Sequence, residues 1–401
     1  MNRRNWLKNS AALTVGATAL PTLLQKAYAD PAARQELYMD LSHEFRAAML
    51  ADAMPPAAVK ARLSANENPW GLSVKTKEAV NNSLTEANRY AGRASMDLYK
   101  VISEKDGIPM PQNPSGGGGW GGPSKSYIKL GCGSTELLNA SLMHFGSKGT
   151  IMVGDPCYIS GNDEKFPMDK VKLTPDYQYD LDAMAKKVDP AKHSLVYICN
   201  PNNPTGNLLP ADKLRKFIDE VSPKVPVLVD EAYIDYANDP KTDCMVDKVK
   251  EGKNVIVLRT MSKLYAFAGM RLGYAIGKPE LLQDISKYTM NGFGVSLPTL
   301  MAAQAAFADT ENSKMVLAKT TESRKYTADF LKKAGYKVIP SYANFMLFPV
   351  NMKGTELTGK LMQEGVMVRN WFFDGQHWCR VSIGTMDEMK AFTDAFTKVV
   401  S

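Results

Sequence analysis

Two short motifs place chemically active side chains directly after apolar runs that predict strands. Lys263 follows the apolar run 254–258, and a lysine amine can act as a nucleophile or as a base. Asp230 ends a second run, and its carboxylate can hold a proton or a cation. Open α/β sheets bind ligands at the carboxyl ends of their strands, so both positions suit ligand chemistry. Taken alone, each also has an ordinary explanation: a surface charge for the lysine, a helix cap or a magnesium ligand for the acid.

A third motif, residues 197–206, runs from an apolar strand into a turn rich in asparagine and proline. Asn, Pro and Gly favour tight turns, so this segment alone predicts a turn and nothing more. The lysine motif carries more information, because Thr260 and Ser262 place hydroxyl groups beside Lys263 and Arg271 follows eight residues later. Three such motifs in this order are difficult to attribute to coincidence.

The three motifs resemble those of the fold-type-I aminotransferases of class I and II, and the resemblance covers most of the chain from about residue 65 to residue 383. The matching segments are NNPTG at 202–206, DEAY at 230–233 and SK at 262–263. Within that superfamily the chain is most similar to the histidinol-phosphate aminotransferase branch, through SANENPWG at 64–71, NRY at 88–90, GCGSTE at 131–136 and RVSIGT at 380–385. The resemblance implies pyridoxal 5′-phosphate as the cofactor and amino transfer as the reaction.

The resemblance assigns roles around the cofactor ring that also make chemical sense. Lys263 is expected to form an imine with the cofactor and, once released by the substrate, to remove the Cα proton. Asp230 is expected to pair with the pyridine nitrogen, because a fixed carboxylate keeps that nitrogen protonated and the ring an electron sink. Asn203 and Tyr233 are expected to hydrogen-bond the 3′ oxygen of the ring, and Tyr158 to stack on its face. Lys263, Asp230 and Tyr233 are thus the expected catalytic residues.

The cofactor phosphate needs a site of its own. Gly133, Ser134 and Thr135 lie where a strand turns into a helix, and backbone N–H groups together with the helix dipole favour an anion there. The expected cradle also includes the hydroxyl groups of Thr260 and Ser262 and the guanidinium group of Arg271. By the resemblance, Tyr90 of a neighbouring subunit completes it. A tyrosine shared between subunits implies a homodimer.

Two arginines and an asparagine remain for the substrate. In the family, the position matching Arg380 binds the substrate carboxylate or phosphate, the position matching Arg369 supports a distal anion, and Asn68 is expected to join them. The aromatic run 371–373 and Trp378 lie between the arginines, where they either line the side-chain pocket or pack in a core. We expect an anionic amino donor, either an aromatic amino acid or a compound like histidinol phosphate, and an oxo acid such as 2-oxoglutarate as the acceptor.

Other functions compete with this interpretation. A decarboxylase or lyase on the same scaffold would share the motifs, because a fold does not fix a reaction. A non-catalytic protein that binds the cofactor would need neither a mobile base nor an electron sink, so the presence of Lys263 and Asp230 counts against it. The glycine-rich segment 114–123 lacks the phosphate-loop pattern GxxxxGK[ST] and predicts a flexible surface insertion instead of a nucleotide site.

The apolar runs predict the elements that position these residues. From 127 to about 276 they alternate with helical patterns, which indicates an α/β domain with a mostly parallel sheet and helices on both faces. Its strands are expected near 127–130, 150–153, 171–174, 194–199, 225–229, 254–259 and 271–276. A smaller α+β domain follows, with helices at 299–308 and 313–334 and strands at 345–350, 366–368 and 379–383. The expected organisation is an export signal at 1–29, an arm with part of the small domain at 30–75, a large cofactor-binding domain at 76–297 and a small domain at 298–401.

Composition argues against several other classes of protein. The 401 residues, 44% of them apolar and 23% charged, suffice for two globular domains. Four of the basic residues behind the net charge of +7 lie in the first 29 positions, and without a basic stripe and interleaved aromatics no nucleic-acid binding is expected. The five cysteines and four histidines lack CxxC or HExxH spacing, so neither a disulfide framework nor a metal site is expected.

The first 29 residues resemble a twin-arginine export signal. Arg3 and Arg4 precede an apolar stretch, 11–24, that is shorter than the ~20 residues needed to span a bilayer. Small residues at Ala27 and Ala29 predict cleavage after Ala29. We expect export of the folded, cofactor-loaded enzyme to the periplasm without stable membrane insertion. Export would separate it from intracellular histidine biosynthesis, which favours an aromatic amino acid as the donor.

Overall fold

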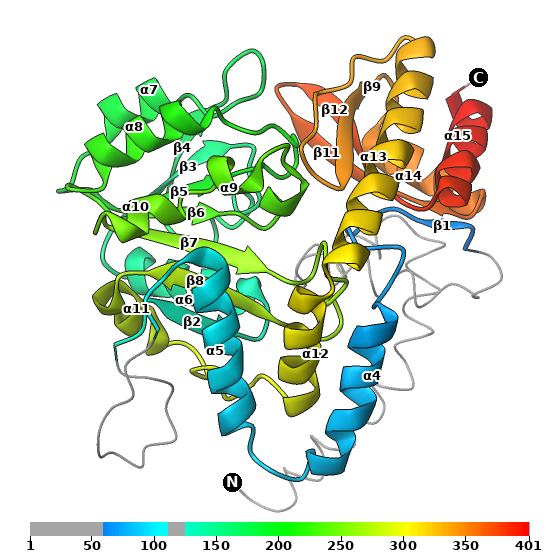
Figure 1. Cartoon of the computed structure of the whole chain (residues 1–401). Helices are drawn as coiled ribbons and strands as arrows, with labels where there is room; N and C mark the ends of the chain where they lie inside the picture. The colour runs from blue at the N-terminus through cyan, green and yellow to red at the C-terminus, as the bar shows by residue number, and fades with distance from the viewer. Residues whose placement is uncertain (1–58, 111–124, 401) are drawn as a thin grey trace, which may run out of the picture.

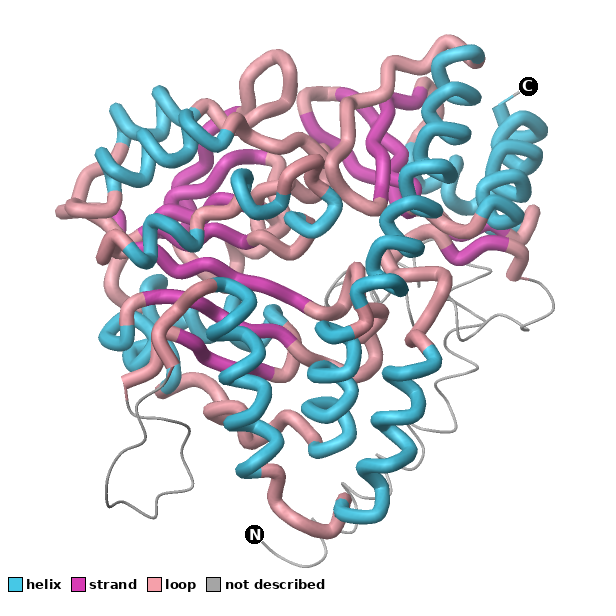
Figure 2. The backbone as a smooth tube through the Cα atoms, viewed as in Figure 1, coloured by secondary structure: helices cyan, strands magenta, loops and turns pink. Residues whose placement is uncertain are grey.

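The computed structural model describes residues 59–110 and 125–400 of the chain (Figure 1). The expected export signal at 1–29, most of the expected arm and the glycine-rich segment 114–123 lie outside the described residues. The described residues form a seven-stranded, a three-stranded and a two-stranded sheet with helices packed around them (Figure 2). Buried apolar side chains gather in one large cluster and in a second, smaller one that belongs mainly to the C-terminal part.

The seven-stranded sheet has the order β2-β8-β7-β6-β5-β3-β4. Neighbouring strands are parallel except around β8, which runs antiparallel to both β2 and β7. The strands are β2 (Ile128–Gly131), β3 (Thr150–Asp155), β4 (Met168–Lys172), β5 (His193–Cys199), β6 (Val227–Asp230), β7 (Val255–Thr260) and β8 (Gly273–Gly277). Each overlaps one of the seven strands expected from the apolar runs, so the mostly parallel α/β sheet is confirmed.

β8 is reversed because the chain returns from the end of β7 without a crossover helix. The connection, residues 261–272, contains no helix, whereas a parallel neighbour requires a crossover that is usually helical. The two strands therefore pair antiparallel, with Thr260 opposite Gly273. This arrangement leaves Lys263 in the loop at the carboxyl end of β7.

The central strands β5, β6 and β7 are buried along almost their whole length. Their sequences are nearly continuous apolar runs, as expected for strands covered on both faces. In α8, the residues Leu214, Phe217, Ile218 and Val221 recur at helical spacing and are buried in the same cluster as the strands.

Helices cover both faces of this sheet (Figure 1). The helical elements of this part are α4 (Val74–Ser83), η2 (Leu84–Glu86), α5 (Gly92–Asp106), α6 (Ser134–Gly146), α7 (Leu181–Lys187), α8 (Ala211–Val221), η3 (Ile234–Tyr236), α9 (Pro240–Asp243), α10 (Val246–Lys250), α11 (Pro279–Ser286) and α12 (Leu297–Ala308).

The smaller cluster gathers the C-terminal elements. Three antiparallel strands in the order β11-β12-β9 form its sheet: β9 (Phe345–Val350), β11 (Arg369–Phe373) and β12 (Gln376–Ser382). The helices beside them are α13 (Thr310–Lys333), α14 (Gly354–Gln363) and α15 (Met386–Val400). A short strand near the start of the described chain, β1 (Ala61–Arg62), pairs in parallel with β10 (Val366–Met367) and so joins this part of the molecule.

α12 packs with the larger cluster, although the expected domain boundary falls at its start. Leu300, Ala302 and Ala303 are buried there, and the helix lies against α4 and α5. Figure 1 shows α13 continuing from α12 toward the smaller sheet, where its Leu331 enters the second cluster. The chain thus passes from one cluster to the other along α13, and the domain boundaries themselves stay predictions.

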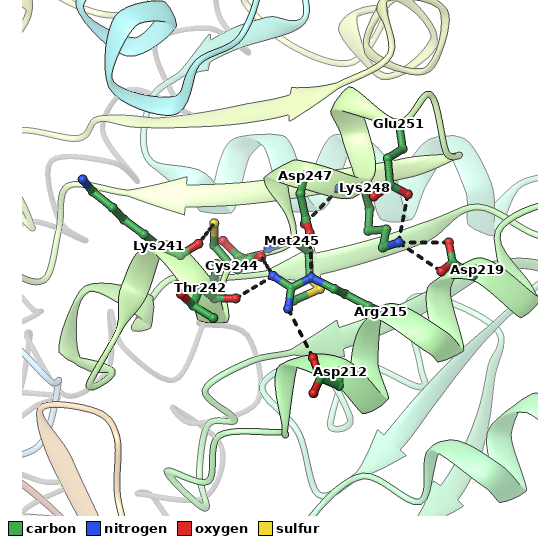
Figure 3. Close-up of polar contacts among 11 residues, drawn as sticks. Asp212, Arg215, Asp219, Lys241, Thr242, Cys244, Met245, Asp247, Lys248 and Glu251 are labelled. Carbon is green, nitrogen blue, oxygen red and sulfur yellow. Dashed lines mark hydrogen bonds and ion pairs between the residues drawn. The ribbon is translucent and has the colours of Figure 1, made fainter.

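A polar network holds the segment that follows β6 against α8 (Figure 3). Arg215 Nε donates to Oδ2 of Asp247 at 2.6 Å, and its Nη2 donates to the carbonyl of Thr242 at 2.6 Å. Lys248 Nζ lies 3.0 Å from Oδ2 of Asp219. These contacts hold residues 242–248 against α8.

Candidate active site

The carboxyl ends of β5, β6 and β7 meet at one edge of the sheet. The backbone N–H of Asn200 donates to the carbonyl of Asp230 at 2.9 Å, and that of Glu231 donates to the carbonyl of Leu258 at 3.0 Å. The turn after β5, the acid at the end of β6 and the loop that carries Lys263 therefore lie next to one another, where open α/β sheets bind ligands.

Asp230 is buried, and both of its carboxylate oxygens accept hydrogen bonds. Oδ2 accepts from the hydroxyl group of Tyr197 at 3.0 Å, and Oδ1 accepts from the backbone N–H of Ala232 at 3.2 Å. Buried charges persist in proteins when such partners satisfy them. The carboxylate is therefore held in a defined direction at the sheet edge.

The next residue, Glu231, anchors the backbone beside that carboxylate. Oε1 of Glu231 accepts from the N–H of Met245 at 2.6 Å, and Oε2 accepts from Nε of Arg259 at 2.7 Å. Both charged side chains are buried. Because removal of one partner from a buried ion pair leaves an uncompensated charge, this pair fixes β6 and β7 at the level of the site.

Lys263 and Tyr233 face one another. The Lys263 side chain is buried, with 9% of the residue exposed; its Nζ donates to the carbonyl of Ala65 at 3.4 Å and lies 5.6 Å from the centre of the Tyr233 ring. The Tyr233 hydroxyl group accepts from Nδ2 of Asn66 at 3.0 Å and from Nδ2 of Asn203 at 3.2 Å. The expected lysine, tyrosine and asparagine thus come together from three separate segments of the chain, and a fourth segment supplies Ala65 and Asn66.

Arg380 reaches this group from β12. Its Nη1 donates to Oδ1 of Asn203 at 2.7 Å and its Nη2 to the carbonyl of Ser64 at 2.8 Å, and the guanidinium group lies 5.3 Å from the centre of the Phe345 ring. Arg380 is 1% exposed, so it is a structural part of the site and not a surface arginine. Arg369 pairs with it directly across β11 and β12, which places both side chains on the same face of the small sheet.

Several of the residues expected to hold the phosphate lie together at the start of α6. Gly133 precedes the helix with a φ of 79°, and a Cβ atom built there would lie 2.3 Å from Nη2 of Arg271. Gly273 on β8 would likewise place a Cβ atom 2.3 Å from the backbone nitrogen of Ser134. Glycine at both positions lets the helix start, β8 and the guanidinium group approach closely. Thr135 lies in the first turn of α6.

The two hydroxyl residues and Tyr158 lie at or just after the ends of strands of the sheet. Thr260 ends β7 and Ser262 follows it, both are buried, and the N–H of Ser262 donates to Oγ1 of Thr260 at 3.2 Å. Tyr158 is half-buried in the loop after β3. The contacts of these three side chains with a cofactor stay predictions.

Asn68 takes part in the backbone of its own loop. Its Nδ2 donates to the carbonyl of Leu264 at 2.7 Å, and its Oδ1 accepts from the N–H of Trp70 at 3.0 Å. It also lines a cavity of about 320 Å³ between residues 62–71, the loop 266–269 and residues 382–388. Asn68 therefore connects the lysine loop to this cavity, whereas a direct contact with substrate stays a prediction.

Tyr90 lies on the surface of the chain. It is 78% exposed, and its ring makes an edge contact with Phe293 at 6.2 Å between centroids. Phe293 is itself 45% exposed. Two aromatic side chains at one exposed place form an apolar surface.

Packing accounts for much of the aromatic run on β11 and β12. Phe373 and Trp378 stack at 4.7 Å between ring centroids, and Tyr177 meets Trp378 edge-on at 5.1 Å. Trp378 is buried with Leu347 in a small hydrophobic cluster. Phe372 is exposed. Of the two sequence interpretations, core packing holds for Phe373 and Trp378.

Two buried partners of the site were not among the residues expected from the sequence. Asn66 donates to Tyr233, and its N–H donates to Oγ of Ser382 at 2.8 Å. Tyr197 donates to Asp230. Asn66 lies within the segment 64–71 that carries the family resemblance, and its φ of 55° marks an unusual backbone. Tyr197 begins the motif 197–206, but it lies in the strand part of that motif, where an aromatic residue is ordinary.

Two other features concern residues 59–110 and 125–400. In these ranges no helix combines the length and the apolar character that crossing a membrane requires. The same residues contain no group of three or more His, Cys, Asp or Glu side chains arranged to hold a metal ion.

Comparison with known proteins places the chain among aminotransferases. Residues 125–396 match the family model described as aminotransferase class I and II. Histidinol-phosphate aminotransferase 1 of Idiomarina loihiensis is 31% identical over 348 residues, which cover 84% of this chain and 89% of that protein. Aromatic amino acid aminotransferase of Mycobacteroides abscessus is 32% identical over 350 residues, which cover 84% of this chain and 92% of that protein.

A solved structure supports the fold. The histidinol-phosphate aminotransferase of Sinorhizobium meliloti in complex with pyridoxal-5′-phosphate matches with a TM-score of 0.74 at 23% identity. The match covers 87% of this chain and 94% of that one. At this level of identity the likeness concerns the fold.

Proposed function

The chain belongs to the class I and II aminotransferase family and is a pyridoxal-phosphate-dependent aminotransferase; from this we propose that Lys263 binds the cofactor and that Arg380 and Arg369 bind an anionic amino donor. The family membership makes a decarboxylase, a lyase or a non-catalytic binding protein the weaker interpretations of the same motifs.

The residues of the site fit this cofactor in charge and in space. Asp230 offers a fixed carboxylate and Lys263 a buried amine. The start of α6 offers an anion site, where Arg271 approaches Gly133 so closely that a Cβ atom would collide with it. When bound, the cofactor draws electrons from the Cα–H bond of the donor, so that the Cα proton can leave.

The chain's own groups then move and hold the protons. Lys263 Nζ takes the proton from the donor Cα, and its burial beneath Tyr233 limits the access of water. Asp230 holds the proton of the ring nitrogen. The Tyr233 hydroxyl group, with Asn66 and Asn203 both donating to it, is fixed for contact with the ring oxygen.

The pairing of Arg369 with Arg380 is the observation that carries the substrate proposal. The two guanidinium groups extend from the same face of the small sheet, so one anion can contact both of them. Planar guanidinium groups bind carboxylate or phosphate in bidentate geometry. An amino acid or a phosphorylated amino alcohol satisfies this requirement.

An aromatic amino acid is our first choice of donor, with 2-oxoglutarate as the acceptor. Relatives named for histidinol phosphate and for aromatic amino acids are about equally similar to this chain. The expected export of the enzyme favours the second class, because an exported enzyme would not meet the intermediates of histidine biosynthesis. A compound like histidinol phosphate is the second candidate.

Initial rates test this choice. Phenylalanine, tyrosine, histidine and histidinol phosphate are compared as donors with 2-oxoglutarate as acceptor, and the pyridoxamine form of the cofactor is followed by absorbance in single half-reactions. We expect an aromatic amino acid to give the highest kcat/KM and to convert the cofactor stoichiometrically. A kcat/KM for histidinol phosphate a hundredfold above that of the aromatic amino acids would contradict the choice of donor. If none of the four donors converts the cofactor to its pyridoxamine form, amino transfer is contradicted.

The homodimer and the export are further parts of the proposal. Exposure of Tyr90 and Phe293 at one surface supports an interface there, from which Tyr90 would reach the phosphate of the partner's cofactor. Export rests on Arg3, Arg4 and the cleavage site at Ala29. Replacing both arginines by lysine is expected to leave the uncleaved protein in the cytosol. Unchanged localisation and processing would contradict the export.

A further inference from the structure

Tyr197 places a hydroxyl group in the middle of an apolar strand. Its neighbours on β5 are Val196 and Ile198, and its side chain has no exposed surface. Burying a hydroxyl group costs free energy unless the group is hydrogen-bonded, and phenylalanine would fill the same space without that cost. The partner of this hydroxyl group therefore indicates what tyrosine contributes here.

The partner is the carboxylate of Asp230, whose Oδ2 lies 3.0 Å from the Tyr197 hydroxyl oxygen. On the adjacent parallel strand, Tyr197 pairs with Leu228, and Asp230 lies two residues further along β6. Side chains two residues apart share a face of the sheet, so Tyr197 and Asp230 meet as diagonal neighbours. The contact thus follows from the register of two central strands.

The second oxygen of the carboxylate is held as well. Oδ1 of Asp230 accepts from the backbone N–H of Ala232 at 3.2 Å. A donor on each oxygen fixes the rotation of the carboxylate about its own bond. Burial, and after it the negative charge of Asp230, raise the pKa of Tyr197 well above its ordinary value, so the hydroxyl group stays protonated and remains a donor.

We propose that Tyr197 is a positioning residue that aims the carboxylate of Asp230 at the ring nitrogen of the cofactor. This role rests on the proposed function of Asp230. Tyr197 acts through Asp230 and contacts neither substrate nor cofactor. Loss of its hydroxyl group therefore weakens the hold on the ring proton and leaves donor binding intact.

The variant Tyr197→Phe removes the hydroxyl group and keeps the shape of the side chain. We expect kcat of the holoenzyme to fall about tenfold or more, as for the loss of one hydrogen bond to a charged group, while KM for the donor is unchanged. Nitrogen-15 NMR of bound, ring-labelled pyridoxal phosphate gives a readout besides activity. Its ring signal is expected to move toward that of the unprotonated nitrogen.

Tyr179 provides a matched control. It is also buried beside the site, but its hydroxyl group donates to Oδ1 of Asn202 at 3.1 Å and accepts from the N–H of Cys199 at 3.0 Å. Tyr179→Phe removes a hydroxyl group of equal size without touching Asp230, so the ring-nitrogen signal is expected to stay as in the wild type. Melting temperatures of both variants show whether packing is disturbed.

A double variant separates positioning from an independent effect. If Tyr197 acts through Asp230, the change Tyr197→Phe has no further effect on kcat in an Asp230→Asn background. Independent, additive losses would overturn the proposal. So would a Tyr197→Phe enzyme with wild-type kcat and ring-nitrogen signal while Asp230→Asn alters both. If Asp230→Asn leaves the nitrogen signal unchanged, the proposed function of Asp230 fails, and the role of Tyr197 fails with it.

Discussion

Nη1 of Arg380 lies 2.7 Å from Oδ1 of Asn203, and the same Asn203 donates through Nδ2 to the hydroxyl group of Tyr233 at 3.2 Å. One amide thus connects the arginine on the small sheet to the phenol that faces Lys263. An anionic group that binds Arg380 must share its guanidinium group with Asn203 or displace it. If Arg380 binds the donor as proposed, donor binding is coupled to the hydrogen bonds that surround the lysine.

Replacing Arg380 by lysine tests this coupling. Lysine keeps the charge but cannot form the planar fork that reaches two acceptors at once. We expect KM for the donor to rise tenfold or more, since a charge-assisted hydrogen bond is worth about 1.5–3 kcal/mol. Steady-state kinetics measure KM for the donor in Arg380→Lys and in Arg369→Lys, the same change at the paired position. An unchanged KM in Arg380→Lys would exclude this arginine from the substrate site.

Asp230→Asn separates rate from cofactor affinity. An amide cannot hold the ring nitrogen protonated, so kcat is expected to fall at least tenfold, in line with the loss of about 1.5–3 kcal/mol. Cofactor affinity should change much less, because the phosphate cradle at Gly133 and Arg271 is untouched. On one preparation of the variant, kcat is measured by steady-state rates and cofactor affinity by equilibrium dialysis, so that the two effects are separated. Wild-type turnover in this variant would refute the electron-sink role.

Mixed dimers test the expected sharing of Tyr90. Tyr90→Phe is expected to weaken cofactor binding about tenfold by removing one hydrogen bond to a phosphate, and Lys263→Ala to abolish turnover. A dimer with one chain of each kind contains one site with both Lys263 and Tyr90, because each comes from a different chain. The two variant chains are coexpressed with different affinity tags, and purification through both tags in turn gives the mixed dimer. Recovery of wild-type cofactor affinity in its active site is expected, and affinity equal to that of Tyr90→Phe would contradict the sharing.

Asp169 should make the stability of the fold depend on acid pH. Burial raises the pKa of this carboxyl, but hydrogen bonds from Lys187, Lys192 and His193 outweigh burial and hold the pKa well below its ordinary value. A carboxylate with a pKa lowered by folding stabilises the protein above its unfolded pKa of about 3.9, and this contribution is lost as the pH falls below that value.

We therefore expect Asp169→Asn to lower the free energy of unfolding by about 1 kcal/mol at pH 7, after allowance for solvent screening. The difference from the wild type should shrink as the pH falls below about 4. Urea unfolding of both proteins at pH 7 and below about pH 4 measures this difference in the free energy of unfolding. Asp163→Asn is the control, because that carboxylate is half-exposed and pairs with Lys170 at the surface. A difference that grows toward low pH would contradict the sign of the effect.

The central strands of the large sheet could be predicted because they are buried on both faces. Residues 194–199 and 254–259 are almost wholly apolar, and a continuous apolar run of that length predicts a central strand. β11 could not be predicted in the same way. Its residues, Arg369–Phe373, are mostly half-buried and mix polar with aromatic side chains, and the strand is defined by its pairing with β12.

The candidate catalytic and cofactor-binding residues could be predicted where they lie within a recognised motif. Lys263, Asp230, Asn203 and Tyr233 lie within the recognised segments and come together in the structure. The support for these residues could not be predicted, since it comes from distant parts of the chain. Tyr197, for example, reaches Asp230 through strand register across 33 positions.

Lys263 is the residue that we propose carries the cofactor. Borohydride reduction of the holoenzyme, followed by trypsin digestion and mass spectrometry, tests this proposal most directly, because reduction fixes the cofactor to the lysine that bound it and trypsin does not cut at a modified lysine. We predict that the label lies on the peptide 260–271, which contains Lys263 and runs from the residue after Arg259 to Arg271. The Lys263→Ala protein should carry no label. A label on any other lysine of the wild-type enzyme would contradict the account.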